Sequence, residues 1–413
     1  MKFLLLNQTF YPDVASTAQH LADLAAALAA RGHEVTVIAA RRAYDDPQTR
    51  FPKHEFWRGV RIVRVNSSGF GKSAKWRRVI DFATFVILSC FRAICLGPRD
   101  VVVALTSPPL ISLLGLALAR LWRSRFVYWV MDLNPDEAVA AGWLAAGSLP
   151  TSLLESASRL SLNNANQIFA LDRFMANRLL QKGIRSERIT VLPPWSHDPE
   201  VRFDAAGRER FRRRHGLQGK FVVMHSGNHS PCHPLDTVIE ATRRLADRDD
   251  VVFCFIGGGS ELRRIRRLFA GASSSHDPEN SHWEGRNVLC LPYQPLSELS
   301  ASLSAADLHL VLHGNEFIGI VHPCKIYNIL RLATPLVYIG PDPSPISDIL
   351  SEANGELLSA SIRHGDVDGL VRRIQEFQTR PAHFDRPRHL SLANRFCKEE
   401  ILPRLIAHLE CNR

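Results

Sequence analysis

Residues 308–330 read LHLVLHGNEFIGIVHPCKIYNIL, and this stretch contains one complete strand–loop–helix unit. The apolar run 308–312 predicts a buried strand, and Pro323 suits the start of the helix that follows. The first turn of a helix presents unpaired N–H groups and partial positive charge, to which Lys325 adds a full charge. An anion, most simply a phosphate, is the expected ligand of such a helix start. An ordinary strand–helix crossover with a surface lysine explains the same residues, so this stretch alone leaves both interpretations open.

The same alternation of strands and helices runs through the whole chain. The first half predicts strands at 3–6, 34–39, 60–65, 100–105, 125–130, 167–170 and 188–192. The second half predicts strands at 221–225, 251–256, 288–291, 308–312 and 335–339. Helical patterns such as 17–31, 110–122 and 262–268 separate them, which predicts parallel sheets covered on both faces. We therefore expect an α/β fold of two doubly wound, Rossmann-like domains that face a central cleft.

Length and composition fit a globular protein of two domains. A chain of 413 residues is too long for one ordinary core. Its eight cysteines are scattered without a C-x-x-C pair, which indicates reduced thiols in a cytoplasm. Residues 1–12 lack the length and cleavage site of a signal peptide. No uninterrupted apolar run reaches about 18 residues, so we expect no membrane-spanning helix.

Positive charge is concentrated in residues 41–99. This segment holds 13 Lys/Arg against four Asp/Glu, a balance of +9, whereas the whole chain carries +10. Lys72, Lys75, Arg77 and Arg78 precede a mostly apolar stretch at 80–96. A basic cluster beside an apolar helix suits an anionic membrane surface, and a domain helix with a solvated basic edge is the alternative. Nucleic acid is not expected as a partner, because no basic motif interleaved with aromatic residues is present.

Polar residues and glycines follow several of the predicted strands. In parallel sheets, ligands bind at the carboxyl ends of the strands. The residues in such positions are Asp132, Gly227, Asn228, Gly257, Gly258, Tyr293, Gln294 and Glu316. Glycines let the backbone approach a ligand closely, but the triple glycine at 257–259 is not G-x-G-x-x-G and so does not indicate a dinucleotide fingerprint.

Several motifs resemble those of the GT-B glycosyltransferases of family 4. Two stretches near the N-terminus, FYPDVASTAQ (10–19) and ARGHEV (30–35), resemble the N-terminal region of that family. The stretch VMDLNPD (130–136) resembles the D-L-x-P motif of the family. Four further stretches resemble the donor-binding half of the family: SGN (226–228), LDT (235–237), GGGSE (257–261) and PCKIYN (323–328). The helix that follows RFC (395–397) resembles the C-terminal helix of the family. The likeness covers nearly the whole chain in the right order. The branch that it resembles most is the bacterial surface-polysaccharide transferases.

The resemblance implies a division of the chain and an activity. The parts are an acceptor-binding Rossmann-like domain at 1–192, a linker at 193–200, a nucleotide-sugar-binding Rossmann-like domain at 201–385 and a helix at 386–413 that returns to the first domain. The activity is retaining transfer of a sugar from a nucleotide diphosphate donor, expected to be a UDP-sugar, to a sugar acceptor. No metal or other cofactor is expected. A lipid-linked acceptor implies a cytoplasmic protein held peripherally at the inner face of the cell membrane through residues 41–99.

The site residues follow from these motifs. Lys325, Glu316 and Asp132 are the expected catalytic residues: Lys325 neutralises the diphosphate, Glu316 holds sugar hydroxyls, and Asp132 positions the acceptor or assists proton removal. A structural cap of the following helix is the alternative role for Asp132. The expected donor-binding residues are Gly227, Asn228, His233, Gly257, Gly258, Tyr293, Gln294, Gly319 and Asn328.

The chain departs from the family pattern in its donor half. The family often carries Glu-x7-Glu, and Asn328 takes the place of the second Glu when the later helix is matched. Asn228 and His233 stand where the family has Arg and Lys. Lys325 is thereby left as the main cation for the diphosphate.

Other functions remain open from the sequence. A nucleotide-sugar epimerase can use a similar two-domain fold, and a non-catalytic scaffold that binds nucleotide or membrane would explain the missing cations. A metal site is conceivable from His225, His229, His233, His313, His322, Cys232 and Cys324, but their spacing matches no zinc pattern. Histidines that line a cleft or form buried hydrogen bonds are the preferred interpretation.

Overall fold

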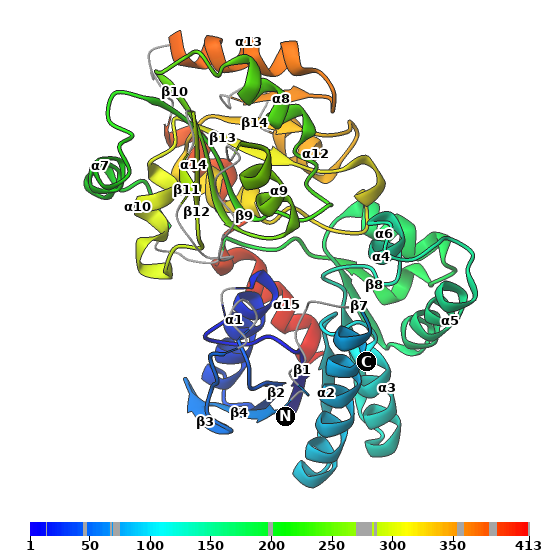
Figure 1. Ribbon diagram of the computed structural model, residues 1–413. Coiled ribbons are helices and arrows are strands. Elements are labelled where there is room, and N and C mark those ends of the chain that lie inside the picture. The colour runs from blue at the N-terminus through cyan, green and yellow to red at the C-terminus, as the bar shows by residue number, and fades with distance from the viewer. Residues whose placement is uncertain are drawn as a thin grey trace. The chain divides into compact units, whose positions relative to one another are not determined.

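The computed structural model describes residues 1–13, 15–43, 48–66, 68, 75–196, 201–269, 283–284, 287–352, 359–379 and 386–411. The chain packs into two compact units (Figure 1). The N-unit comprises Met1–Pro194, Gly319–His322 and Ile401–Arg413, and the C-unit comprises Trp195–Ile318 and Pro323–Glu400. The second half of the chain therefore supplies two separate pieces to the N-unit.

The N-unit is built on a mostly parallel sheet. Its strand order is β3-β4-β2-β1-β5-β6-β7-β8, with β3 antiparallel to β4 at one edge. The strands are β1 (Lys2–Leu6), β2 (Glu34–Ala40), β3 (His54–Trp57), β4 (Val60–Val65), β5 (Val101–Ala104), β6 (Arg125–Trp129), β7 (Gln167–Ala170) and β8 (Ile189–Val191). Phe3, Leu4 and Leu5 of the central strand β1 are fully buried. A continuous apolar run is what a parallel strand needs when helices cover both faces of its sheet.

Helices flank this sheet. They are α1 (Ser16–Ala30), α2 (Lys75–Leu96), α3 (Ile111–Trp122), α4 (Asp136–Ala140), α5 (Leu149–Asn164), α6 (Arg173–Gln181) and the 3-10 turn η1 (Ser186–Arg188). Helix α15 (Lys398–Glu410) joins the N-unit from Ile401 onward. Its Glu410 carboxylate accepts hydrogen bonds from Arg31 and His33, which follow α1. These bonds fix the end of the chain to the start of the N-unit.

The C-unit repeats the design. Its strand order is β11-β12-β10-β9-β13-β14-β15, with β11 antiparallel to β12. The strands are β9 (Phe221–Asn228), β10 (Val251–Gly258), β11 (Trp283–Glu284), β12 (Val288–Leu291), β13 (Leu308–Leu312), β14 (Leu336–Ile339) and β15 (Ser359–Ile362). The helices are α7 (Ala205–Arg214), α8 (Asp236–Arg244), α9 (Ser260–Phe269), α10 (Leu299–Ser304), α11 (Lys325–Leu332), α12 (Pro345–Ser351), α13 (Val367–Thr379) and α14 (Arg386–Asn394), with 3-10 turns η2 (Leu296–Glu298) and η3 (Asn315–Phe317).

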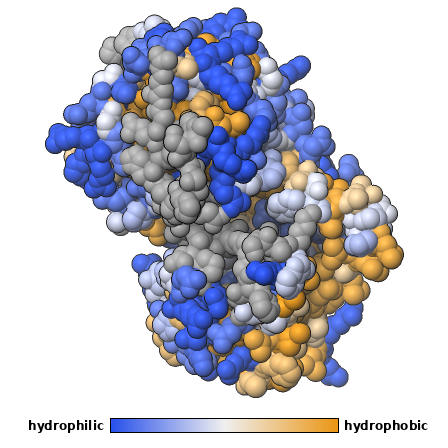
Figure 2. All heavy atoms as spheres, viewed as in Figure 1, coloured by the Kyte–Doolittle hydropathy of each residue, from blue (hydrophilic) through white to orange (hydrophobic). Residues whose placement is uncertain are grey.

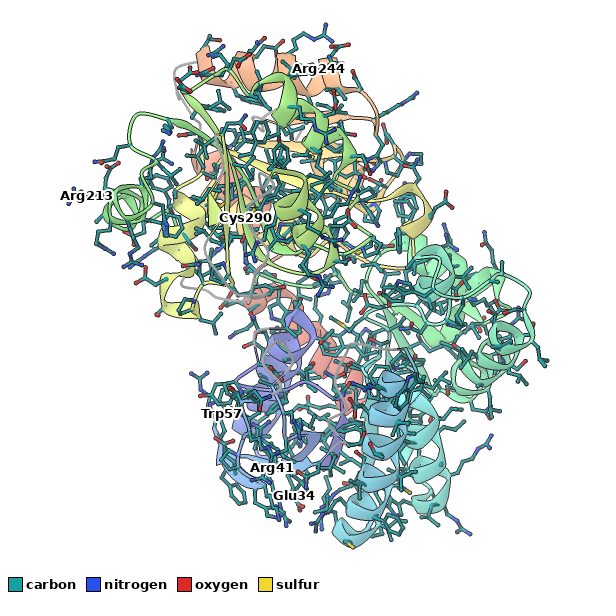
Figure 3. All side chains as sticks on the ribbon, viewed as in Figure 1. Glu34, Arg41, Trp57, Arg213, Arg244 and Cys290 are labelled. Atoms are coloured by element: carbon teal, nitrogen blue, oxygen red, sulfur yellow. The ribbon has the colours of Figure 1, made fainter. Side chains whose placement is uncertain are left out.

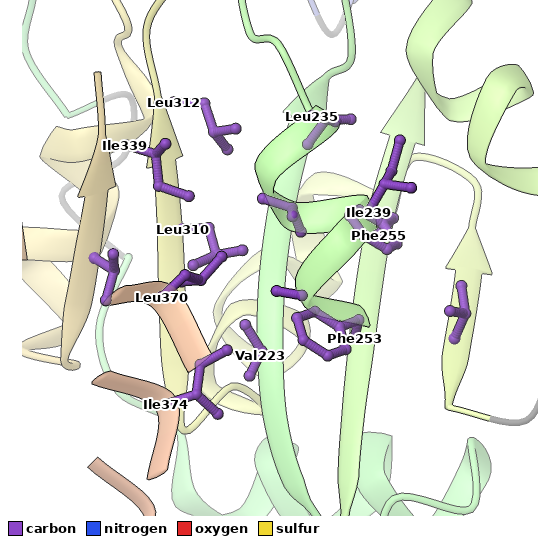
Figure 4. Packing of buried hydrophobic residues seen from close by; sticks show 14 of the residues in the cluster. Val223, Leu235, Ile239, Phe253, Phe255, Leu310, Leu312, Ile339, Leu370 and Ile374 are labelled. Atoms are coloured by element: carbon purple, nitrogen blue, oxygen red, sulfur yellow. The ribbon is translucent and has the colours of Figure 1, made fainter. Parts of the chain in front are cut away.

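Apolar side chains join the C-unit sheet to its helices (Figure 4). Val223, Phe253 and Leu310 project from three neighbouring strands and share a buried cluster with Leu370 and Ile374 of α13. Polar groups lie outside this layer. Figure 3 shows Arg213 and Arg244 extending from α7 and α8 at the surface of the C-unit. The alternation of buried strand and exposed helix face follows from the hydrophobic periodicity of the sequence.

The predicted fold class is confirmed: two α/β units each carry a mainly parallel sheet. The strands at 60–65, 167–170, 288–291 and 308–312 have the predicted bounds. The prediction missed β3, β11 and β15. Each is an edge strand, and β15, with the sequence SASI, lacks the apolar run that marks a central strand.

The bounds of β9 and β10 were predicted too short. Both strands continue past the apolar run, and Gly257 pairs with Gly227 and Gly258 with Asn228. The glycines end the hydrophobic pattern but not the hydrogen-bonded ladder. The predicted ligand loops therefore begin with residues that still belong to the sheet.

Helix α2 corrects a second expectation. Its 22 residues include one segment, Val79–Leu96, that is long and apolar enough to cross a membrane, whereas no spanning helix was expected. Isolated polar residues such as Asp81 and Arg92 interrupt the apolar run without ending the helix. Counting uninterrupted residues therefore underestimated its length.

Two predictions fall partly outside the described residues. Residues 197–200 of the predicted linker and Lys72 of the basic cluster lie there. The side chains of Lys75 and Arg78 also lie outside the described part of the chain, whereas Arg77 is described and exposed.

A partly buried ion cluster around Asp307 generates the first prediction. The Asp307 carboxylate pairs with Arg208 and Arg212 and accepts the Val222 N–H at 2.7 Å, so it ties α7 to β9. Asp307→Ala leaves two arginines without their carboxylate and is expected to lower the free energy of unfolding by about 3 kcal/mol. The exposed Asp249→Ala is the control and should change it by less than about 0.5 kcal/mol. Urea unfolding measures both, and equal values for the two variants would contradict the role of Asp307.

Candidate functional site

The predicted phosphate-binding residues meet at one end of the C-unit sheet. Lys325 is the first residue of α11. Its Cε and Nζ atoms lie 3.6 and 3.7 Å from the point that a Cβ on Gly227 would occupy. Gly227 pairs with Gly257 across β9 and β10. A lysine, a helix start and two glycine strand ends are thus placed together.

Glycine is required at these strand ends. A Cβ on Gly257 would overlap the Gly227 carbonyl, and a Cβ on Gly259 would overlap the His229 carbonyl. Gly257 and Gly259 also have positive φ angles, 136° and 120°, at which other residues are strained. The backbone at these two positions therefore lies closer to its neighbours than a side chain would permit.

His225 holds the Lys325 side chain. The His225 Nε2 atom lies 2.9 Å from Lys325 Nζ, and its Nδ1 lies 3.0 Å from the Leu310 carbonyl oxygen. A carbonyl only accepts, so Nδ1 carries the proton, and Nε2 of the neutral ring accepts a hydrogen bond from Lys325. His225 is fully buried, and this burial, followed by the charge of Lys325, keeps its pKa well below the usual range.

Lys325 has no acidic partner among the described residues. The ion pairs of the described residues do not include it, and the groups whose charges act on it are the thiols of Cys232 and Cys324 and the nearby imidazoles. Burial lowers the pKa of Lys325 to about 7. A cation that the protein itself does not neutralise is suited to an anionic ligand.

Two further histidines surround this lysine. The His233 Nδ1 donates to the Leu312 carbonyl at 2.7 Å, two residues along β13 from the carbonyl that His225 uses. His229 is fully buried, and neither of its ring nitrogens has a hydrogen-bond partner within the described part of the chain. Burial lowers the pKa of His229 to about 3. Sequence reasoning placed His233 in the donor site but did not predict that His225 or His229 would lie beside Lys325, because a strand pattern does not show which ring faces a lysine.

Other predicted donor residues lie around the glycines. The Tyr293 ring is 3.1 Å from the point that a Cβ on Gly258 would occupy, and the Asn228 side chain lies against Gly259. Gln294 folds back to donate to the Pro292 carbonyl. Asn328, in α11, has a buried Oδ1 with no hydrogen-bond partner among the described residues. These placements are compatible with the predicted roles, which stay predictions.

Glu316 lies in a different environment. It is exposed on η3 and lines a cavity of about 440 Å³ together with Asp236, Thr237 and His364. No contact between Glu316 and Lys325 appears among the described residues. Glu316 follows β13 as the sequence predicted, the lining of this cavity does not include Lys325, and the role of Glu316 stays a prediction.

Asp132 and Gly319 belong to the N-unit. Asp132 forms a backbone bridge with Val321, and the Leu133 N–H donates to the Ile320 carbonyl at 2.9 Å. Burial, followed by the charge of Glu137, raises the pKa of Asp132 to about 8. The alternative role as a cap of α4 is wrong, since the cap position of α4 is Pro135.

The segment 319–322 is anchored in the N-unit by its side chains as well. The His322 Nδ1 lies 2.8 Å from the Asp172 carboxylate, whose other oxygen caps α6 through the Met175 N–H. A Cβ on Gly319 would lie 2.6 Å from the Phe174 carbonyl, so this position also requires glycine. The predicted donor residue Gly319 is thus packed against α6. No sequence signal linked Asp172 to His322, because 150 positions separate them.

A metal site was considered from the histidines. Within the described ranges, no group of three or more His, Cys, Asp or Glu side chains is placed to hold a metal ion. The imidazoles of His225 and His233 instead donate to carbonyls of β13. The interpretation of these histidines as buried, hydrogen-bonded residues is confirmed for these two.

Comparison with known proteins is consistent with this arrangement. Residues 17–195 match the glycosyl transferase 4-like domain family. The putative colanic acid biosynthesis glycosyl transferase WcaI of Escherichia coli K12 is 24% identical over 401 residues, which are 93% of each chain. The probable glycosyltransferase WbjE of Pseudomonas aeruginosa is 24% identical over 281 residues, 67% of this chain and 66% of that protein.

Solved structures share the fold over the whole chain. Sucrose-phosphate synthase from Thermosynechococcus elongatus has a TM-score of 0.73 and 14% identity, over 99% of this chain and 98% of that one. Anabaena HepE in complex with UDP-glucose has a TM-score of 0.67 and 16% identity, over 99% of both chains. The predicted GT-B fold and the family resemblance are confirmed. The chain therefore has the GT-B fold and carries a glycosyl transferase 4-like domain over residues 17–195, and it is similar to glycosyltransferases over nearly its whole length.

Proposed function

We propose that this glycosyltransferase is a retaining, metal-independent enzyme that moves a sugar from a UDP-sugar to a lipid-linked sugar acceptor. The observation that carries the donor part is Lys325, a partly buried lysine without an acidic partner among the described residues, beside glycine strand ends. A diphosphate supplies the missing negative charge. The UDP and UDP-glucose complexes of HepE support a UDP-sugar, and the name of WcaI supports a role in surface-polysaccharide synthesis.

The chemistry needs positive charge at the leaving group. The bond between the anomeric carbon and the diphosphate breaks, and negative charge builds on the phosphate oxygens. Lys325 is held by His225 before the reaction starts, so it stabilises that charge without rearrangement. In this proposal Tyr293 and Gln294 contact the base, and Asn328 contacts the ribose.

The acceptor part of the proposal rests on Asp132. The acceptor hydroxyl must lose its proton as it bonds to the anomeric carbon. A carboxyl with a pKa of about 8 is a stronger base than an ordinary aspartate once it is ionised. We therefore assign proton removal to Asp132 and expect its ionised form to be the active one.

The membrane part rests on α2. Its exposed apolar residues fall on one face and include Val79, Ile87, Phe91 and Ile94. The opposite face is packed: Phe85, Ser89 and Ala93 are fully buried, and α2 contacts α3, β2 and β4. A spanning helix exposes all of its faces to lipid or to other membrane segments, so α2 would have to leave this sheet to span. An in-plane helix in the headgroup region keeps the packing and buries the exposed face.

Neighbouring helices extend this apolar surface. Figure 2 shows hydrophobic residues gathered over α2, α3 and α5. Exposed members beyond α2 are Leu121, Trp143, Leu149, Leu153 and Leu160. Exposed arginines on the same helices are Arg77, Arg92, Arg120 and Arg159, whereas Asp81 and Glu155 are only partly exposed. This combination supports an anionic leaflet, and hence a cytoplasmic enzyme held peripherally at the inner face of the cell membrane.

Lys325→Met tests the donor site. Loss of a charge-assisted bond to phosphate costs about 1.5–3 kcal/mol, so transfer should fall at least about tenfold. Lys220→Met, at the other end of β9, is the matched control and should leave transfer unchanged. A thermal-shift screen of nucleoside diphosphates measures binding, since a ligand at a hundred times its dissociation constant adds about 2.7 kcal/mol.

The same assays separate the alternative functions. Unchanged donor binding and turnover in Lys325→Met would remove this residue from the site. Epimerised donor in the absence of acceptor would indicate an epimerase. Nucleotide binding without transfer or donor hydrolysis would indicate a non-catalytic scaffold.

The raised pKa of Asp132 predicts how kcat/KM depends on pH. Because its pKa is raised to about 8, kcat/KM for the acceptor at saturating donor should rise with pH and level off above about 8. Glu137→Gln removes a charge that raises this pKa, so the rising limb should move to lower pH. Asp132→Asn should lose the limb and about 100-fold or more in rate. If the rise of kcat/KM occurs at the same pH in Glu137→Gln and in the native protein, a group other than Asp132 is responsible for it.

Liposome flotation tests the membrane surface. We expect the protein to float with anionic vesicles at low salt, and added salt or alkaline carbonate to release it, as for an in-plane helix. Ile87→Glu with Phe91→Glu should abolish flotation, whereas Leu296→Glu, on the C-unit and 50% exposed in the native protein, should not. Carbonate-resistant protein would indicate a spanning helix, and flotation retained in the double variant would contradict the surface altogether.

A further inference from the structure

We propose that Lys325 and His225 form a proton-accepting pair, so that binding of the donor diphosphate draws one proton from solution onto the Lys325 amine. The inference rests on the proposed donor site. It adds His225 as a positioning residue and gives donor binding a defined pH dependence. The histidine side of this pair is absent from the predicted site residues.

The first step is the fixed orientation of His225. Its Nδ1–H is committed to the Leu310 carbonyl at 3.0 Å, so Nε2 has a lone pair and no proton. Lys325 Nζ lies 2.9 Å from that lone pair. The ring is fully buried and cannot turn without losing its bond to β13. His225 therefore accepts from Lys325 in either protonation state of the amine and holds it beside Gly227.

The second step is the absence of countercharge. The titratable groups that act on this pair are His229, His233, Cys232 and Cys324, from the loop after β9 and the residue before α11. Burial holds the pKa values of the three imidazoles low, so these rings are neutral near pH 7. No carboxylate forms an ion pair with Lys325 within the described ranges. In the free protein the ammonium therefore stands without an opposite charge, and its pKa falls to about 7.

The third step is the effect of the ligand. A diphosphate places negative charge next to Nζ and favours the ammonium form. The amine takes one proton from the buffer, and the resulting ammonium donates to a phosphate oxygen and to His225; no bond to carbon changes. Protonation is linked to binding, so affinity is highest at or below about pH 7. Above that pH it should weaken by up to about tenfold per pH unit until the pKa of the complex is reached.

Calorimetry measures the proton directly. UDP, GDP, ADP and dTDP are titrated into the whole protein in buffers of different ionisation enthalpy, and the dependence of the heat on the buffer counts the protons taken up. We expect about half a proton at pH 7.0 and close to one at pH 8.5. The terminal phosphate of these nucleotides titrates near pH 6 and so contributes little in this range.

Three variants assign the proton. Lys325→Arg keeps the charge permanently, so it should bind without proton uptake and without the loss of affinity above pH 7. His225→Phe removes the acceptor of the ammonium, so uptake at pH 7.0 should rise from about half towards one proton. His309→Asn is the matched control, because His309 is equally buried and bonded to a carbonyl, and should leave uptake unchanged.

The outcomes distinguish this inference from the donor site itself. If none of the nucleotides binds, the donor site is wrong and this inference falls with it. If a nucleotide binds without proton uptake, the donor site stands and the lysine–histidine pair is wrong. Uptake that persists in Lys325→Arg, or that is the same in His225→Phe and the native protein, also overturns the pair. Where His225→Phe fails to fold, His225→Asn replaces it; an amide that restores the acceptor should keep uptake near half a proton at pH 7.0.

Discussion

The donor end of the C-unit depends on the close contact between the ends of β9 and β10. Gly257 can lie this close to the Gly227 carbonyl only because residue 257 carries no side chain, and the pairing of the two glycines extends the sheet beyond its apolar strands. The extension carries the backbone up to the Lys325 amine at the start of α11. His225, which contacts the Lys325 amine, lies on the same strand as Gly227. A larger residue at either glycine would move the backbone and the lysine apart.

The ammonium group of Lys325 has no carboxylate beside it among the described residues. Lys325 has an imidazole acceptor instead of a carboxylate, so its charge is held but not cancelled. An acidic partner would raise the stability of the free protein and compete with the ligand for the lysine. The structure thus favours binding of an external anion over internal pairing, which is the property that a transferase of diphosphate-linked sugars needs at its leaving group.

The two units differ in the surfaces that they present. The N-unit exposes apolar residues on α2, α3 and α5, whereas the C-unit exposes arginines on α7 and α8. The N-unit also takes in the segment 319–322 through the Asp172–His322 pair and backbone bonds to Asp132 and Leu133. Lys325 follows three residues later in the sequence and belongs to the C-unit.

The sequence by itself determined the alternation of strands and helices, the two parallel sheets and the position of Lys325 after a buried strand. These follow from local hydrophobic periodicity and from the helix-start preference around Pro323, which need no knowledge of distant residues. The resemblance of several motifs to a known family added the expectation of a GT-B fold. Only the tertiary structure decided that His225 faces Lys325, that Asp172 pairs with His322, and that α2 keeps one face packed while the other is exposed. Each of these depends on which side chains from remote strands and helices meet, and on how burial changes their charge, and neither is encoded in the spacing of residues along the chain.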